Sequence, residues 1–130
     1  MQTAANVFLD FHDYASFADK RRDKDASTAV LINHITITEF GDLMVLRIVA
    51  SHFLWKMVRR IMGILVEVGR GNLSKSDVEA LFASKSDLPA KFTAPPSGLF
   101  LEKVFYQKDA WNSSKIPEFP FILIKNKTPD

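Results

Sequence analysis

Ser51-His-Phe-Leu-Trp-Lys-Met-Val-Arg-Arg-Ile-Met-Gly-Ile-Leu-Val-Glu-Val-Gly69 is the stretch that decides the fold. Its apolar residues recur at steps of three and four, which is the period of an α-helix with a buried side. They are Phe53, Leu54, Met57, Val58, Ile61, Ile64, Leu65 and Val68. Ser51 is expected to cap the start, and Gly69 or Gly71 to end the helix in the left-handed region. The pattern predicts one long, almost wholly apolar helix.

The few polar residues of this helix are expected on one narrow face. This face contains Lys56, Arg60, Gly63 and Glu67, and Arg59 lies at its edge, where the apolar surface begins. A buried guanidinium without a partner is costly, and no acidic residue lies a turn before Arg59. Either a partner comes from outside the helix, or Arg59 reaches solvent along its aliphatic stem; the pattern alone favours the second.

Gly63 is a second unusual residue of this helix. A glycine in a helix interior costs about 1 kcal/mol relative to alanine. Its presence in an otherwise strong helix suggests close contact with another element, so we expect Gly63 to tolerate no large residue. The alternative is a tolerated surface glycine.

Composition places the chain among ordinary single-domain proteins. Its 130 residues include 47% hydrophobic and 25% charged residues, with a net charge of +2. This mildly basic balance permits a nucleic-acid partner without implying one. The absence of cysteine excludes disulfides and thiolate chemistry. No apolar run has membrane-spanning length and no signal-peptide layout begins the chain, so we expect a cytoplasmic protein.

A β-hairpin is expected before the helix. Met1 to Phe8 looks like the end of a helix begun upstream, which suggests a fragment. From Thr28 to Phe40 the residues alternate as in a strand, and Gly41-Asp42 fits a two-residue turn with glycine first. Leu43 to Ala50 returns with both faces apolar. We therefore expect this second strand to be central and covered on both sides.

After the long helix, Ser74-Lys-Ser-Asp77 predicts a capping box that starts a second helix. Lys85 to Ser97 is expected to be a loop, and Gly98 to Tyr106 a further strand. Phe119 to Ile124 could add an edge strand. The order strand, strand, helix, helix, strand predicts an α+β domain with an antiparallel sheet and helices packed on one face.

Residue chemistry alone indicates no active site. The three histidines, His12, His34 and His52, have no metal-ligand spacing. Ser113-Ser114 has neither an accompanying base nor a glycine elbow. The mixed charges from Asp19 to Asp25 are typical of a solvated loop.

Three motifs resemble the tRNA pseudouridine synthase A family. They are the stretch from Phe53 to Gly71, the segment Phe92-Thr-Ala-Pro-Pro-Ser-Gly-Leu-Phe-Leu101, and His12-Asp13-Tyr14 with Phe17. The resemblance covers residues 1–106, the family's C-terminal half, and leaves 107–130 as a tail of unassigned role. Leu9-Asp10 stands where the family usually has a glycine before the histidine.

The resemblance implies isomerisation of uridine to pseudouridine in tRNA by a homodimer, with no cofactor and no metal. In that family the catalytic aspartate lies in a Gly-Arg-Thr-Asp segment of the N-terminal half, which is not in this chain. Arg59 is the arginine that pairs with it, and Leu99 is the apolar residue near the target base. The residues proposed to contact RNA are Lys56, Arg60, Arg70 and Lys103.

Two other functions stay open at this point. The chain could be an RNA-binding module that has lost catalysis, or a dimerisation or scaffold domain. Without the missing N-terminal half we expect these residues to fold, to expose an apolar patch that favours self-association, and to make no pseudouridine. In a complete enzyme we expect Arg59 to be irreplaceable and Arg60, facing the polar side, to tolerate alanine.

Overall fold

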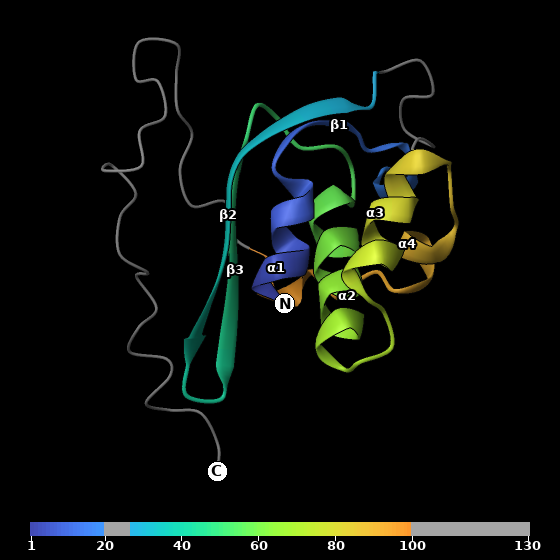
Figure 1. Ribbon diagram of the computed structural model, residues 1–130. Helices are drawn as coiled ribbons and strands as arrows, with labels where there is room; N and C mark the ends of the chain where they lie inside the picture. Colours follow the sequence, from blue (N-terminus) through green and yellow to red (C-terminus); the bar gives the residue numbers. More distant parts are fainter. Residues whose placement is uncertain (20–26, 100–130) are drawn as a thin grey trace, which may run out of the picture.

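Within the residues that the structure describes, the fold is a three-stranded antiparallel sheet with its helices on one side (Figure 1). A computed structural model describes residues 1–19 and 27–99. The sheet has the order β1-β2-β3, from Asp10–Asp13, Ala29–Phe40 and Leu43–Ala50. The predicted α+β class, with helices packed on one face of an antiparallel sheet, is confirmed.

The β2–β3 hairpin follows the prediction closely. Phe40 pairs with Leu43 across the turn, and Gly41 has φ 60, which a glycine at the first central position accommodates without strain. Within the described residues β2 is the middle strand and β3 lies at an edge. The predicted strand from Gly98 to Tyr106 begins in a short 3-10 turn, Pro96–Gly98, and its residues from 100 on lie outside the described residues, as does Phe119 to Ile124.

Helix α2, Met57–Gly69, starts later than its apolar period indicates. Ser51 is not its N-cap, because the Ser51 hydroxyl accepts a hydrogen bond from the Leu31 N–H of β2 at 3.2 Å. The residue before the helix is Lys56, whose φ of 65 puts it in the left-handed region. Phe53 therefore lies in the connection to the helix, 44% exposed. The prediction of a helix from Ser51 onward is wrong at this end.

The core lies between α2, the sheet and the N-terminal segment. Helix α1 (Gln2–Ala5) and the 3-10 turn η1 (Asn6–Phe8) pack against α2 and β2. Met57, Ile61, Ile64 and Leu65 of α2 are fully buried. These four residues have the helical spacing predicted from the sequence, so the apolar period identifies the core side of α2 correctly.

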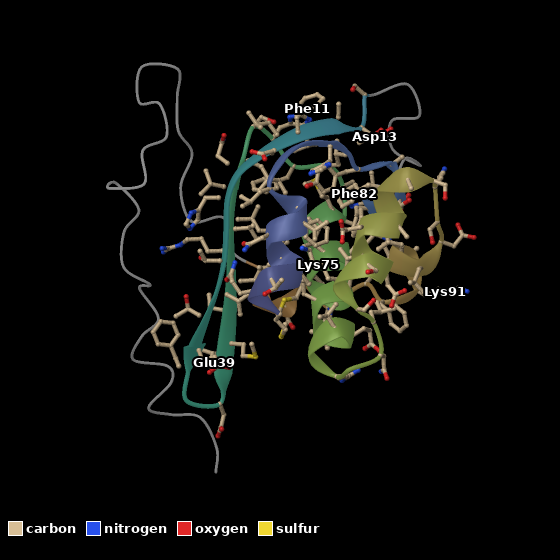
Figure 2. All side chains as sticks on the ribbon, viewed as in Figure 1. Phe11, Asp13, Glu39, Lys75, Phe82 and Lys91 are labelled. Atoms are coloured by element: carbon tan, nitrogen blue, oxygen red, sulfur yellow. The ribbon has the colours of Figure 1, made fainter. Side chains whose placement is uncertain are left out.

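An aromatic cluster joins α3 (Lys75–Ala83) to the N-terminal segment. The Phe82 ring, seen pointing from α3 toward β1 in Figure 2, lies 5.2 to 5.6 Å from the rings of Phe8, Tyr14 and Phe17. The buried Tyr14 hydroxyl donates to the Phe8 carbonyl oxygen at 2.7 Å, and burial raises the pKa of this hydroxyl well above its usual value.

The connection after α2 is partly as predicted. Ser74 and Asp77 form the expected capping box at the start of α3. The expected loop from Lys85 to Ser97 instead contains a short helix, α4 (Leu88–Lys91). Pro89 at its second position favours a helix start, a signal that the loop prediction did not use.

Candidate functional site

A cleft lies beside the first two turns of α2. Its volume is about 520 Å³, and its walls are the 3-10 turn η2 (Ala15–Phe17) with the residues after it, α2, and the segment around α4. The charged residues of the lining are Asp19, Lys56, Arg59, Arg60, Lys85 and Asp87. Four cations face two carboxylates, so the cleft carries a positive formal charge that favours an anionic ligand.

Arg59 is held in this cleft by the backbone of one residue. Its Nε donates to the Ala94 carbonyl oxygen at 2.8 Å, and the Ala94 N–H donates to the Arg59 carbonyl oxygen at 3.0 Å. Arg59 is half-buried, and it makes no ion pair within residues 1–19 and 27–99. Its two terminal nitrogens therefore keep the planar fork that binds a carboxylate bidentately.

Asp19 is a nearly buried carboxylate that joins two of the cations. Its side chain is 6% exposed, with Lys56 Nζ at 3.2 Å and Arg60 Nη2 at 3.9 Å from its Oδ2. Arg60 is only 11% exposed and also donates to the Ala18 carbonyl oxygen at 3.1 Å. Arg60 therefore lies on the polar side of the helix, and this side is covered by Asp19 and Ala18.

The rest of the expected polar face is buried as well. The carbonyl oxygen of Phe92 lies over Gly63, 1.4 Å from where a Cβ would stand, so the predicted close contact at Gly63 is confirmed. Glu67 is 6% exposed and accepts hydrogen bonds from Arg70 and Asn72, both at 2.9 Å. Neighbouring segments therefore pack on the polar face of α2.

The remaining predicted site residues lie apart from the cleft. Arg70 is 68% exposed and pairs with Glu67 at the far end of α2, about 16 Å from Arg59 by helical rise. Leu99 is 51% exposed and does not line the cleft, and its N–H donates to the Pro96 carbonyl oxygen at 3.0 Å. Lys103 lies outside the described residues. Of the predicted residues, the cleft brings together Lys56, Arg59 and Arg60.

Two participants were not expected from the sequence. Lys85 lines the cleft from the segment before α4, and only its charge could have suggested it. Ala94 holds Arg59 through its peptide group, which every residue possesses. A backbone partner leaves no signal in residue type, so sequence patterns could not have found it.

Neither a metal cluster nor a membrane span is found in the part of the chain that the structure describes. No group of three or more His, Cys, Asp or Glu side chains there could hold a metal ion. Among the same residues, no helix is long and apolar enough to cross a bilayer. The polar groups of the cleft are mainly lysine, arginine, aspartate and serine side chains.

Comparison with known proteins identifies the family. The family model described as tRNA pseudouridine synthase matches residues 4–107. The tRNA pseudouridine synthase A of Geotalea daltonii is 37% identical over 82% of this chain and 43% of its own length. Those of Staphylococcus aureus (strain MRSA252) and Exiguobacterium sp. are 36% and 33% identical over 89% and 83% of the chain, covering 46% and 44% of their own lengths.

The match to the family model covers most of the chain, while the chain spans less than half the length of these relatives. The three motifs noted in the sequence all fall within the matched residues. The chain belongs to the tRNA pseudouridine synthase family.

Proposed function

We propose that this chain is the C-terminal half of an enzyme that isomerises uridine to pseudouridine in tRNA. In this proposal the chain supplies Arg59, and an N-terminal half supplies the catalytic aspartate. The observation that carries it is the state of Arg59: its Nε is bound to a backbone carbonyl, while no carboxylate in the described residues pairs with it. A guanidinium fixed at one nitrogen and open at two others is prepared for a carboxylate from elsewhere.

The carboxylates already in the cleft do not suit the role of nucleophile. Asp19 is committed to Lys56 and Arg60 and is almost buried, so a substrate atom could reach it only if those contacts opened. Asp87 is exposed and lies on the segment leading into α4, where it makes no ion pair with a described residue. Neither is placed against Arg59. An aspartate delivered by a second domain fits the available side of the guanidinium better.

The proposed reaction needs the target nucleotide to leave its stack and enter the cleft between the two halves. An ionised aspartate starts cleavage of the glycosidic bond, the freed uracil turns, and a carbon–carbon bond to the sugar forms. A neighbouring guanidinium lowers the pKa of a buried carboxylate and fixes its orientation. Arg59 would therefore keep the aspartate ionised and hold its carboxylate in a fixed orientation.

RNA contacts are proposed at the open rim of the cleft. Lys56, just before α2, is 23% exposed, and Lys85, before α4, is exposed, so both ammonium groups can reach phosphate oxygens. Arg60 is less suited, because its guanidinium faces Asp19 and the Ala18 carbonyl oxygen. Arg70 could contact only RNA that extends past the far end of α2, where its side chain is 68% exposed beside the nearly buried Glu67.

The test is Arg59→Lys in the complete enzyme, assayed by tritium release from tRNA labelled in its uridines. Lysine keeps the charge but presents a point donor in place of the planar fork. Loss of one partner of a buried pair costs on the order of 3–5 kcal/mol, or about 10²–10⁴-fold in turnover. The matched control is Arg70→Lys, the same change at the exposed end of the same helix, which should retain activity. Turnover by Arg59→Lys equal to that of the control would contradict the proposal.

A further inference from the structure

We infer that residues 92–95 form a backbone brace that orients the Arg59 guanidinium, and that Gly63 is the positioning residue that admits this brace. The inference rests on the function proposed for Arg59, and adds a second group on α2 on which that function depends. The brace contacts α2 at two positions that are one helical turn apart.

The first contact is at Gly63. A Cβ built on this residue would lie 1.4 Å from the Phe92 carbonyl oxygen and 2.5 Å from its carbonyl carbon. Both are backbone atoms, so no side chain can turn aside to make room. Heavy atoms in ordinary contact lie roughly 3.5 Å apart, and any other residue would push the brace outward by about 2 Å. Only glycine allows this approach.

The second contact is at Arg59, one helical turn before Gly63. Here Ala94 uses both of its backbone groups: its N–H donates to the Arg59 carbonyl oxygen, and its carbonyl oxygen accepts from Arg59 Nε at 2.8 Å. Two residues of extended chain span about 6.6 Å, close to the rise of one turn. Phe92 over Gly63 and Ala94 at Arg59 are therefore in register. Pro95 reinforces this, because a residue before proline is held in extended backbone.

The two contacts share one short segment, so a change at Gly63 must reach Arg59. A displacement of about 2 Å would take the Arg59 Nε and the Ala94 oxygen beyond hydrogen-bond distance. The guanidinium would then lose the only hydrogen bond that its side chain makes within residues 1–19 and 27–99. Gly63 itself is not one of the residues that line the cleft.

The primary experiment is Gly63→Ala, read by the exchange of the Arg59 Nε–H with water in the ¹⁵N-labelled chain. The signal is assigned by its absence from Arg59→Lys. In the parent chain we expect the Arg59 Nε–H to exchange more slowly than the Nε–H of exposed Arg70. In Gly63→Ala we expect the Arg59 Nε–H to exchange as fast as that of Arg70. The matched control is Gly69→Ala in the same helix, where a new Cβ meets only the flexible end of Met1 at 2.8 Å. This readout does not depend on whether the protein makes pseudouridine.

The second readout is turnover in the complete enzyme. A misplacement on the scale of 1 Å can cost about 10²-fold, so kcat of Gly63→Ala should fall by about that factor while KM for tRNA stays unchanged. Gly69→Ala should keep both constants. A folded Gly63→Ala enzyme with the parent's kcat, or with slow Arg59 Nε–H exchange, would overturn the inference.

A second variant decides the matter if Gly63→Ala does not fold. Pro95→Gly adds no atom at the contact with α2 but frees the backbone of Ala94. We expect faster Arg59 Nε–H exchange together with a lower kcat. Faster exchange with unchanged kcat, or no change in exchange, would show that the brace does not position Arg59.

Discussion

Replacement of Asp19 by asparagine should destabilise the fold strongly, although the change removes only one charge. The Asp19 carboxylate is 6% exposed and lies 3.2 Å from Lys56 Nζ and 3.9 Å from Arg60 Nη2. At an effective dielectric constant near 20, each such pair attracts by roughly 4–5 kcal/mol before desolvation is counted. Removing one partner from a buried pair costs about 3–5 kcal/mol in measured cases.

The expected loss is at the low end of that range. Lys56 is 23% exposed and can recover some hydration, and asparagine keeps an acceptor oxygen for Arg60. We expect the free energy of unfolding to fall by about 2–3 kcal/mol, a decrease in Tm of roughly 10 °C for a domain of this size.

The assay is urea and thermal unfolding followed by circular dichroism, with Asp87→Asn as the matched control. Asp87 is exposed on the same cleft and makes no ion pair with a described residue, so its loss should change stability by less than about 0.5 kcal/mol. The difference between the variants should persist in high salt, since buried pairs are weakly screened. Equal stabilities of the two variants would refute this account of Asp19.

Two further predictions concern the sheet. Asp10 has φ 73, a backbone conformation that glycine adopts without strain, so Asp10→Gly should raise the free energy of unfolding by up to about 1 kcal/mol in chemical denaturation. Asp42→Gly, in the hairpin turn without a positive φ, should lower it, and a decrease in both would contradict the strain at Asp10. Burial of the His34 imidazole is the larger cause, and the charge of Arg47 the smaller, of a pKa below the usual value for histidine. Below about pH 6.5 the unfolded chain therefore binds a proton at His34 more readily than the folded chain does. Stability should therefore fall as the pH drops through this range, and His34→Gln should flatten the decrease; an unchanged pH dependence would exclude His34 as its source.

Local residue patterns predict the hairpin and the capping box because each depends on residues adjacent in sequence. Gly41 supplies the backbone angle that the turn needs, and Ser74 and Asp77 cap α3 without help from elsewhere. The start of α2 depends on a distant strand, since β2 engages Ser51. A periodic pattern contains no information about that contact.

Residue type draws attention to only part of the candidate site. Arg59 could be singled out because no carboxylate of its helix lies a turn away from it, and the close contact at Gly63 because glycine is poor in helices. Burial of Arg60 and Glu67 could not be foreseen, since a polar residue on a helix reads as solvent-facing until its covering segment is known. The partner found for Arg59, the Ala94 backbone, leaves no trace in residue type.

The most direct test of the central claim is product analysis after incubation of this 130-residue chain with unmodified tRNA. The chain should be tested alone, with the proposed N-terminal half, and with an N-terminal half whose Gly-Arg-Thr-Asp aspartate is changed to asparagine. The function proposed for Arg59 requires that the nucleophile be delivered from the other half. We expect pseudouridine only when the unaltered half is present. Pseudouridine made by the chain alone would contradict the account, because the nucleophile would then lie within these residues.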